Sequence, residues 1–330
     1  MEVSRIENLP PPPGIINSIK AGFDAIASHV TAILMPLLLN LLLWLGPRLQ
    51  MDTLFKSIEG DMVRFWQASQ IPADEIQNML EMYDQMTKSV NLFGVVRTLP
   101  IGISSLFLPS DGVLATPLGQ PGIWQVTGVT FPLSLILLTL VGWIGGAFYF
   151  RSVAGASLAE KITSVSTFQA ALQTVLISIA SNMFLFALTM PILLIIFVAM
   201  QLSVVLANLV VLLIALGSVW VIVPIFFWAH GVFLNRQNVL TSALSSIQLT
   251  RFTLPTSSLF VMTVFLLSYG LNFLWRLPSQ DSWMTLLGIF GHSFVTTALL
   301  SASFIYYHEM TIWVQAVLDR LRPNKVIKQA

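Results

Sequence analysis

The sequence predicts an all-α fold, a polytopic membrane bundle of six transmembrane helices paired in three hairpins, with a long, partly helical outer loop. Two observations predict it. The chain of 330 residues is 55% hydrophobic and only 9% charged, whereas soluble domains usually carry roughly 25% charged residues. In addition, its charges are excluded from six long apolar runs. Such segregation is typical of a chain whose solvent is lipid.

About 20 mostly apolar residues are needed to cross a hydrocarbon core of about 30 Å. On this measure we expect a leader with an interfacial helix at 1–27, and then six spans with their connections. The spans are 28–47, 128–150, 170–200, 202–229, 254–276 and 283–307. The leader is rich in proline and mixed in charge, so we predict that the first run is a retained helix and not a cleaved signal peptide.

The orientation follows from the basic residues of the short connections. With six spans, the two ends and the loops 151–169 and 230–253 lie on one side, which holds ten of the sixteen Lys and Arg residues. Five of the other six fall in the loop 48–127, and long loops translocate largely regardless of charge. Both termini are therefore predicted to be cytoplasmic.

The outer loop, 48–127, is the only sizeable part predicted outside the membrane. Two apolar stripes at helical spacing predict two helices within it, and an almost wholly apolar stretch follows at 92–109. That stretch is too interrupted by glycine and proline to span. We interpret it as a lid on the bundle, with a re-entrant half-helix as the alternative.

The tail, 308–330, is predicted to be an amphipathic helix on the cytoplasmic leaflet. Ile312, Trp313 and Val317 belong to one apolar face, and basic residues follow. Basic amphipathic helices bind anionic lipid surfaces.

Apart from Arg276 at the very end of the fifth span, no span contains Asp, Glu, Lys or Arg, which argues against ion-coupled carriers, proton pumps and voltage sensors. Histidine remains. His29, His230 and His308 fall at the inner ends of three spans, where imidazoles could ligate a haem or a chlorophyll-type pigment. Histidine at a helix end also interacts favourably with the terminal carbonyls. If the histidines only interact with these carbonyls, no cofactor is required, and none is predicted.

Neutral polar side chains form stripes on several spans. Asn182, Asn272 and Thr297 are candidates for lining a polar cleft that takes a substrate headgroup. The alternative is helix packing, because small hydroxyls and amides form hydrogen bonds across helix interfaces.

The sequence shows no catalytic constellation. It has no cysteine, which excludes disulfides, thiolate catalysis and Cys-type metal sites. His308–Glu309 is not the start of a zinc-protease motif because Ile occupies position 312. We therefore expect a protein that is not an enzyme, has no metal site and does not bind nucleic acid.

Two segments carry a resemblance. They are PPPPGIINSIKAGFDAI at 10–26, leading to WLGPR at 44–48, and NLFGVVRTLPIGISSL at 91–106. Together they resemble an uncharacterised family of six-helix integral membrane proteins of green non-sulphur bacteria. The resemblance implies a six-helix fold in a bacterial plasma membrane and brings no activity with it. More loosely, AHGVFLNRQNVLTSALSS at 229–246 is similar to the membrane domains of glycerophosphodiester phosphodiesterases, whose catalytic domain this sequence lacks.

The function predicted from these observations is an accessory or structural subunit of a larger membrane assembly, in contact with membrane lipids and other membrane proteins. Two alternatives stay open. One is a transporter or permease component for a lipidic or weakly polar solute, and the other is a haem- or pigment-carrying membrane subunit.

Overall fold

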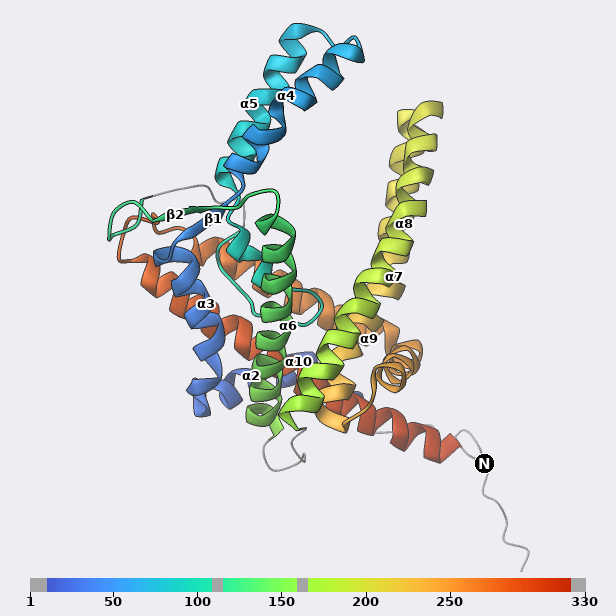
Figure 1. Cartoon of the computed structure of the whole chain (residues 1–330). Helices are drawn as coiled ribbons and strands as arrows, with labels where there is room; N and C mark the ends of the chain where they lie inside the picture. Colours follow the sequence, from blue (N-terminus) through green and yellow to red (C-terminus); the bar gives the residue numbers. More distant parts are fainter. Residues whose placement is uncertain (1–10, 109–114, 159–165, 322–330) are drawn as a thin grey trace, which may run out of the picture. The chain divides into compact units, whose positions relative to one another are not determined.

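The computed structural model describes residues 11–108, 115–158 and 166–321, and these are helical almost throughout (Figure 1). The all-α fold class predicted from the sequence is confirmed. In chain order the elements are α2 (Ile15–Ser28), the 3₁₀ helix η1 (Val30–Ile33), α3 (Leu34–Leu45), β1 (Arg48–Gln50), α4 (Asp52–Ala68), α5 (Ala73–Ser89), the 3₁₀ helix η2 (Leu92–Val96), β2 (Ile123–Gln125), α6 (Thr130–Leu158), α7 (Thr167–Leu202), α8 (Val204–Asn235), α9 (Val239–Trp275) and α10 (Thr285–Leu321).

Among the described residues, five helices, α6 to α10, are long and apolar enough to cross a membrane. A sixth span is present if α2 and the bent continuation through η1 and α3 are counted as one. The chain is therefore a multi-pass membrane protein. Its helices run past the predicted spans: α9 and α10 also include parts of the segments 230–253 and 308–330. Arg322, Lys325 and Lys328, the basic residues of the predicted lipid-binding tail, lie outside the described residues.

The chain divides into two compact units. Unit 1 comprises Met1–His29, Phe150–Leu267 and Thr297–Ala330, and unit 2 comprises Val30–Tyr149 and Ser268–Thr296. Helices α6, α9 and α10 contribute residues to both. Each unit is described by itself below.

Unit 1 is held together by buried aromatic rings. The rings of Phe260 on α9 and Tyr306 on α10 are stacked with their centroids 4.0 Å apart, and Phe227 of α8 lies 5.9 Å from Tyr306. Such pairs add stabilisation beyond the area they bury. On α2, a Cβ at Gly22 would lie 2.5 Å from the carbonyl oxygen of Ala298. Only glycine therefore allows α2 to lie this close to α10.

In unit 2, α4 and α5 form a hairpin whose apolar sides face each other. The ring of Tyr83 on α5 is stacked on two rings of α4, with centroids 5.5 Å from Phe55 and 6.0 Å from Trp66. Pro72 precedes the first turn of α5, and Asp74 and Glu75 lie within that turn, where negative charge interacts favourably with the helix dipole.

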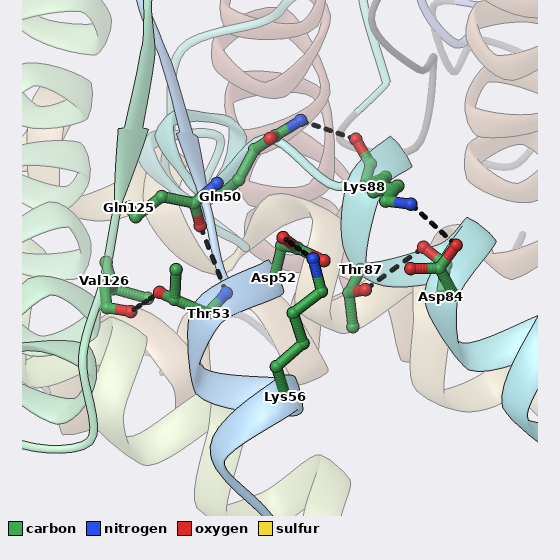
Figure 2. A network of polar contacts seen from close by, with 9 residues as sticks. All are labelled: Gln50, Asp52, Thr53, Lys56, Asp84, Thr87, Lys88, Gln125 and Val126. Carbon is green, nitrogen blue, oxygen red and sulfur yellow. Dashed lines mark hydrogen bonds and ion pairs between the residues drawn. The ribbon is translucent and has the colours of Figure 1, made fainter. Parts of the chain in front are cut away.

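Hydrogen bonds at the base of this hairpin join it to the strands β1 and β2, which pair in parallel (Figure 2). The Gln50 side chain donates to the carbonyl of Lys88 at 2.6 Å, and the Thr53 hydroxyl donates to the carbonyl of Val126 at 2.9 Å. The Lys88 ammonium forms an ion pair with Asp84 at 2.8 Å, and this hydrogen bond raises the pKa of Lys88. Exposed pairs of this kind stabilise little, so the part-buried hydrogen bonds of Gln50 and Thr53 contribute more to fixing the base.

Replacing Tyr83 by Ala should loosen the hairpin. Two aromatic pairs are lost, at about 0.5–1.5 kcal/mol each, so opening of α4 and α5 should become easier by about 1–3 kcal/mol. Amide hydrogen exchange of the two helices in detergent measures this. Met82→Ala, at a neighbouring exposed position, is the control. Equal exchange in the two variants would show that the stacked rings do not hold the hairpin.

Candidate functional site

The candidate site of unit 2 is formed by residues 97–108, here called the inserted segment. It follows η2 and has no regular secondary structure. Four of its apolar side chains, Ile101, Ile103, Leu106 and Phe107, are nevertheless buried, with Ile101 fully inaccessible and Leu106 only 3% exposed, whereas Leu99 and Leu108 near its two ends are exposed. The segment therefore enters the helix bundle of unit 2 and does not lie over it as a lid. It enters as irregular backbone and not as the half-helix considered as the alternative.

Glycines of α6 make room for the segment. A Cβ at Gly142 would lie 2.5 Å from the carbonyl oxygen of Val96, and one at Gly146 would lie 2.8 Å from the Cα atom of Gly102. Gly146 is 16 residues into α6, which corresponds to about 24 Å along the helix. Gly142 and Gly146 are four residues apart, as in a GxxxG motif, and here the motif packs against the inserted segment of the same chain and not against another helix.

The side chain of Asn40 on α3 fixes the end of the segment. Its Oδ1 accepts hydrogen bonds from the backbone N–H of Leu106 at 2.7 Å and from the hydroxyl of Ser105 at 2.9 Å. Its Nδ2 donates to the carbonyl of Pro36 at 2.7 Å. Asn40 is fully buried, so these bonds form where water does not compete.

Arg97 closes the segment on itself. Its guanidinium donates to the carbonyl of Phe107 at 3.0 Å, and the N–H of Phe107 donates to the Ser105 hydroxyl at 3.1 Å. In an apolar environment, each unsatisfied backbone group costs several kcal/mol. The side chains of the segment thus supply bonds that a helix would have supplied from its own backbone.

A second set of hydrogen bonds centres on His292 of α10. Its Nδ1 lies 2.6 Å from Oδ1 of Asn272 on α9, and its Nε2 lies 3.2 Å from the hydroxyl of Ser104 in the segment. An amide oxygen can only accept, so the imidazole donates through Nδ1–H and its Nε2 accepts from Ser104. From donor to acceptor, the hydrogen bonds therefore run from the Ser104 hydroxyl to His292 and from His292 to Asn272.

This order of hydroxyl, imidazole and orienting amide is also the order of a nucleophile, its base and the group that positions the base. Here, however, the imidazole is fully buried. Both of its ring nitrogens are engaged within unit 2. Its evident role is to join the inserted segment to α9 and α10.

The three predicted histidines lie in unit 1 and differ in environment. His29 is exposed at the end of α2, where its Nδ1 is 3.1 Å from the carbonyl of Ala25. His308 is half-buried on α10. His230 is buried, with its Nε2 2.8 Å from the Ser303 hydroxyl and its ring 4.6 Å from that of Phe304.

The hydrogen bonds of Ser303 assign the His230 tautomer. The Ser303 hydroxyl donates to the carbonyl of Leu300 at 2.7 Å, so its oxygen accepts from Nε2–H of His230. An iron ligand requires an unprotonated ring nitrogen. Nε2 of His230 is therefore not free for a haem iron in this arrangement. Its unprotonated nitrogen is Nδ1, which is buried without a hydrogen-bond partner among the described residues. These residues include no group of three or more His, Asp or Glu placed to hold a metal ion.

The predicted cleft residues divide between the units. Asn272 lies in unit 2 and bonds to His292, whereas Asn182 and Thr297 lie in unit 1. The Asn182 amide donates to the carbonyl of Ser178 in its own helix at 2.7 Å, and Thr297 is fully buried. Of the three, only Asn272 belongs to the candidate site.

Asn40, Ser104 and Ser105 were not among the site residues predicted from the sequence. A signal was present for Asn40, which is the only polar residue between Pro36 and Leu43. A lone amide in an apolar span is costly unless it is paired, so it indicates a buried partner. The serines carry no such signal, because a serine hydroxyl in an apolar stretch can bond to nearby backbone and so does not by itself indicate a distant partner.

Comparisons with known protein families, with curated proteins and with solved structures find no match to this chain.

Replacing Asn40 by Ala should release the inserted segment. The backbone N–H of Leu106 loses its acceptor, at a cost of about 1–3 kcal/mol for an unsatisfied buried donor. Thermal unfolding in detergent should shift downward, and amide exchange across 97–108 should rise. The control is Ser134→Ala, which removes a hydroxyl bonded only within α6. Unchanged exchange in Asn40→Ala would contradict this account of the segment.

Replacing Gly142 by Ala should also destabilise the packing of the inserted segment, here from the α6 side, where the segment's entry at Val96 lies against the helix. Ala there forces the carbonyl of Val96 away, and overpacking of this kind costs about 1–3 kcal/mol. At Gly270, where nothing lies within 4 Å of the added Cβ, the same change should be neutral or stabilising, because Ala favours helix. Unfolding temperatures of the two variants should therefore move apart, and a matched response would show that the close approach is unimportant.

Proposed function

We propose that this chain is a non-enzymatic accessory or structural subunit of a larger membrane protein assembly, in a bacterial plasma membrane with both termini in the cytoplasm. The basic residues of the short connections support the orientation. The absence of carboxylates, lysines and arginines from the six apolar runs argues against an ion-coupled activity.

The observation that carries the proposal is the exposure of the α7–α8 hairpin. In the most apolar window of each helix only 6% of the residues are buried, compared with 61% in α10. Leu193, Leu194 and Ile195 are each more than half exposed. Successive residues turn by about 100° around a helix, so apolar side chains cover most of its circumference. These faces are free for another membrane protein.

A glycine on α8 supports packing against a partner helix. A Cβ at Gly217 would meet nothing within 4 Å, so this chain gives the glycine no packing partner in the described structure. Small residues at exposed helix positions let a second backbone approach closely in lipid. Ser218 follows it, with its hydroxyl bonded within its own helix. The two small residues lie between the larger exposed side chains of Leu216 and Trp220.

The subunit role is tested by purifying the full chain from its native membranes in mild detergent and measuring stoichiometry by mass spectrometry. We expect a partner in fixed ratio with wild type and with Gly270→Leu, an open glycine outside the hairpin. Gly217→Leu should lose that partner while unfolding at the same temperature. Recovery of a lone chain, or equal recovery of the partner with both variants, would refute the role.

The second candidate is a transporter component for a lipidic or weakly polar solute. It is favoured by the inserted segment, since irregular backbone within a bundle is typical of transporters and channels. Solute flux in proteoliposomes, abolished by Asn40→Ala, would favour it. The third, a haem or pigment carrier, predicts an absorption band in the visible spectrum of the same purified sample.

A further inference from the structure

The hairpin of α4 and α5 in unit 2 has a charged side. Lys56 pairs with Asp52 along α4, and Lys88 pairs with Asp84 along α5 (Figure 2). The hydrogen bond to Asp84 raises the pKa of Lys88, and the charge of Asp52 on the other helix raises it further. Asp52 and Lys88 are therefore close enough to interact. The two ion pairs lie on the same side of the hairpin, here called the charged side.

The opposite side of the hairpin is apolar. Successive residues of a helix turn by about 100°, so Ile58 and Phe65 lie about 160° and 180° around α4 from the lysine of the charged side. On α5, Met82 and Met86 lie about 120° and 160° from the corresponding lysine. All four side chains are exposed, with Phe65 at 69% and Met82 at 58%. The described structure leaves these four side chains, here called the apolar face, without cover.

The hairpin is also acidic. Residues 52–89 include seven Asp and Glu against three Lys and Arg, and each of the three bases pairs with an aspartate of its own helix. Glu75 forms no ion pair within the described part of the chain. It precedes Met82 by seven residues and Met86 by eleven, so the three share one row of α5. A carboxylate therefore borders the apolar face.

This charge distinguishes between the surfaces that could cover the apolar face. Anionic lipid attracts basic amphipathic helices, and the hairpin offers it no unpaired base within 52–89. A second copy of the chain would bring like charges together, which is unfavourable. A basic protein segment gains from apolar contact and from charge attraction at once.

The shape of the apolar face suits a helix. Two antiparallel helices with one shared apolar side leave a groove along their seam, where a third helix packs its own apolar stripe. Methionine side chains are flexible and adapt to the surface of a bound helix. The row of Met82 and Met86 lies on one side of this seam, and that of Ile58 and Phe65 lies on the other.

We infer that the apolar face docks a basic amphipathic helix of a partner protein, with apolar residues against Phe65 and Met82 and a Lys or Arg beside Glu75. The inference rests on the proposed subunit role and names the chemistry of the partner at this surface. In the proposed orientation, the docked helix lies on the extracytoplasmic side. It is separate from the faces of α7 and α8, which carry no charge.

Photo-crosslinking of the full chain in its native membranes tests the inference. A photoreactive phenylalanine analogue replaces either Met82 or Gln77, which is exposed on the same helix and, eleven residues before Lys88, lies on the charged side. Position 82 should crosslink to one protein, through a peptide of net positive charge with apolar residues at helical spacing. Position 77 should not. Crosslinks to lipid, to a second copy or to an acidic peptide would overturn the inference.

Two pairs of variants test the contacts. Phe65→Ala should lower crosslinking at position 82 by about 5-fold to 30-fold, the effect of losing an aromatic anchor, whereas Gln67→Ala, on the charged side of α4, should not. Glu75→Lys should lower it more than Glu81→Lys, which changes the net charge equally but lies on the charged side. All four variants should remain folded, because these side chains are exposed. Equal effects within either pair would contradict the docking face.

The outcomes separate this inference from the subunit role. If a partner co-purifies in fixed ratio but crosslinks equally from positions 82 and 77, or from neither, the docking face is refuted and the subunit role stands. If no partner co-purifies at all, both are refuted. Raising the salt concentration should weaken crosslinking from position 82, since salt screens the attraction between exposed charges.

Discussion

The structure of unit 2 depends on one constraint: backbone polar groups placed among apolar helices must find partners within the protein. Helices meet this demand from their own backbone, but residues 97–108 do not form a helix. Asn40 accepts the N–H of Leu106, and Arg97 donates to the carbonyl of Phe107. Around them, α6 has glycine where it meets the segment, and α10 contributes His292. The identities of these residues are therefore consequences of a single break in regular structure.

Much of the fold follows from the sequence, because lipid as solvent excludes charge from long runs and leaves few alternatives to helices. Five of the six runs correspond to α6 through α10 and the first corresponds to η1 and α3, while the two apolar stripes of 48–127 correspond to α4 and α5. The sequence did not predict that α9 and α10 continue without a break beyond their apolar runs. The runs end where polar residues begin, but polar residues do not by themselves end a helix. The partners of Asn272 and Asn40 could not be predicted either. Each depends on which segments meet in space: Asn272 bonds to His292 of another helix, and Asn40 bonds to Leu106, 66 residues away in the sequence.

Histidine illustrates the difference between composition and environment. His230 and His292 are both buried, and both form hydrogen bonds to serine, yet their surroundings differ. His230 lies among aromatic rings that hold unit 1 together, whereas His292 joins three segments of unit 2. In each case a polar side chain gives direction to packing that apolar contacts alone would leave loosely specified. The helices differ in environment as well: α10 is largely buried, whereas α7 and α8 are largely exposed.

The inserted segment also has a consequence for biogenesis. Ser104 bonds to His292, a residue made 188 positions later, so this contact cannot form until α10 has been synthesised, whereas the contacts with Asn40 and α6 can form earlier. At about 5–20 residues per second, this interval lasts roughly 10 to 40 s. Throughout it, an apolar, irregular stretch of chain awaits its last helix. The last contact of residues 97–108 therefore forms only after α10 has been made, and until then the segment is held by Asn40 and α6 alone.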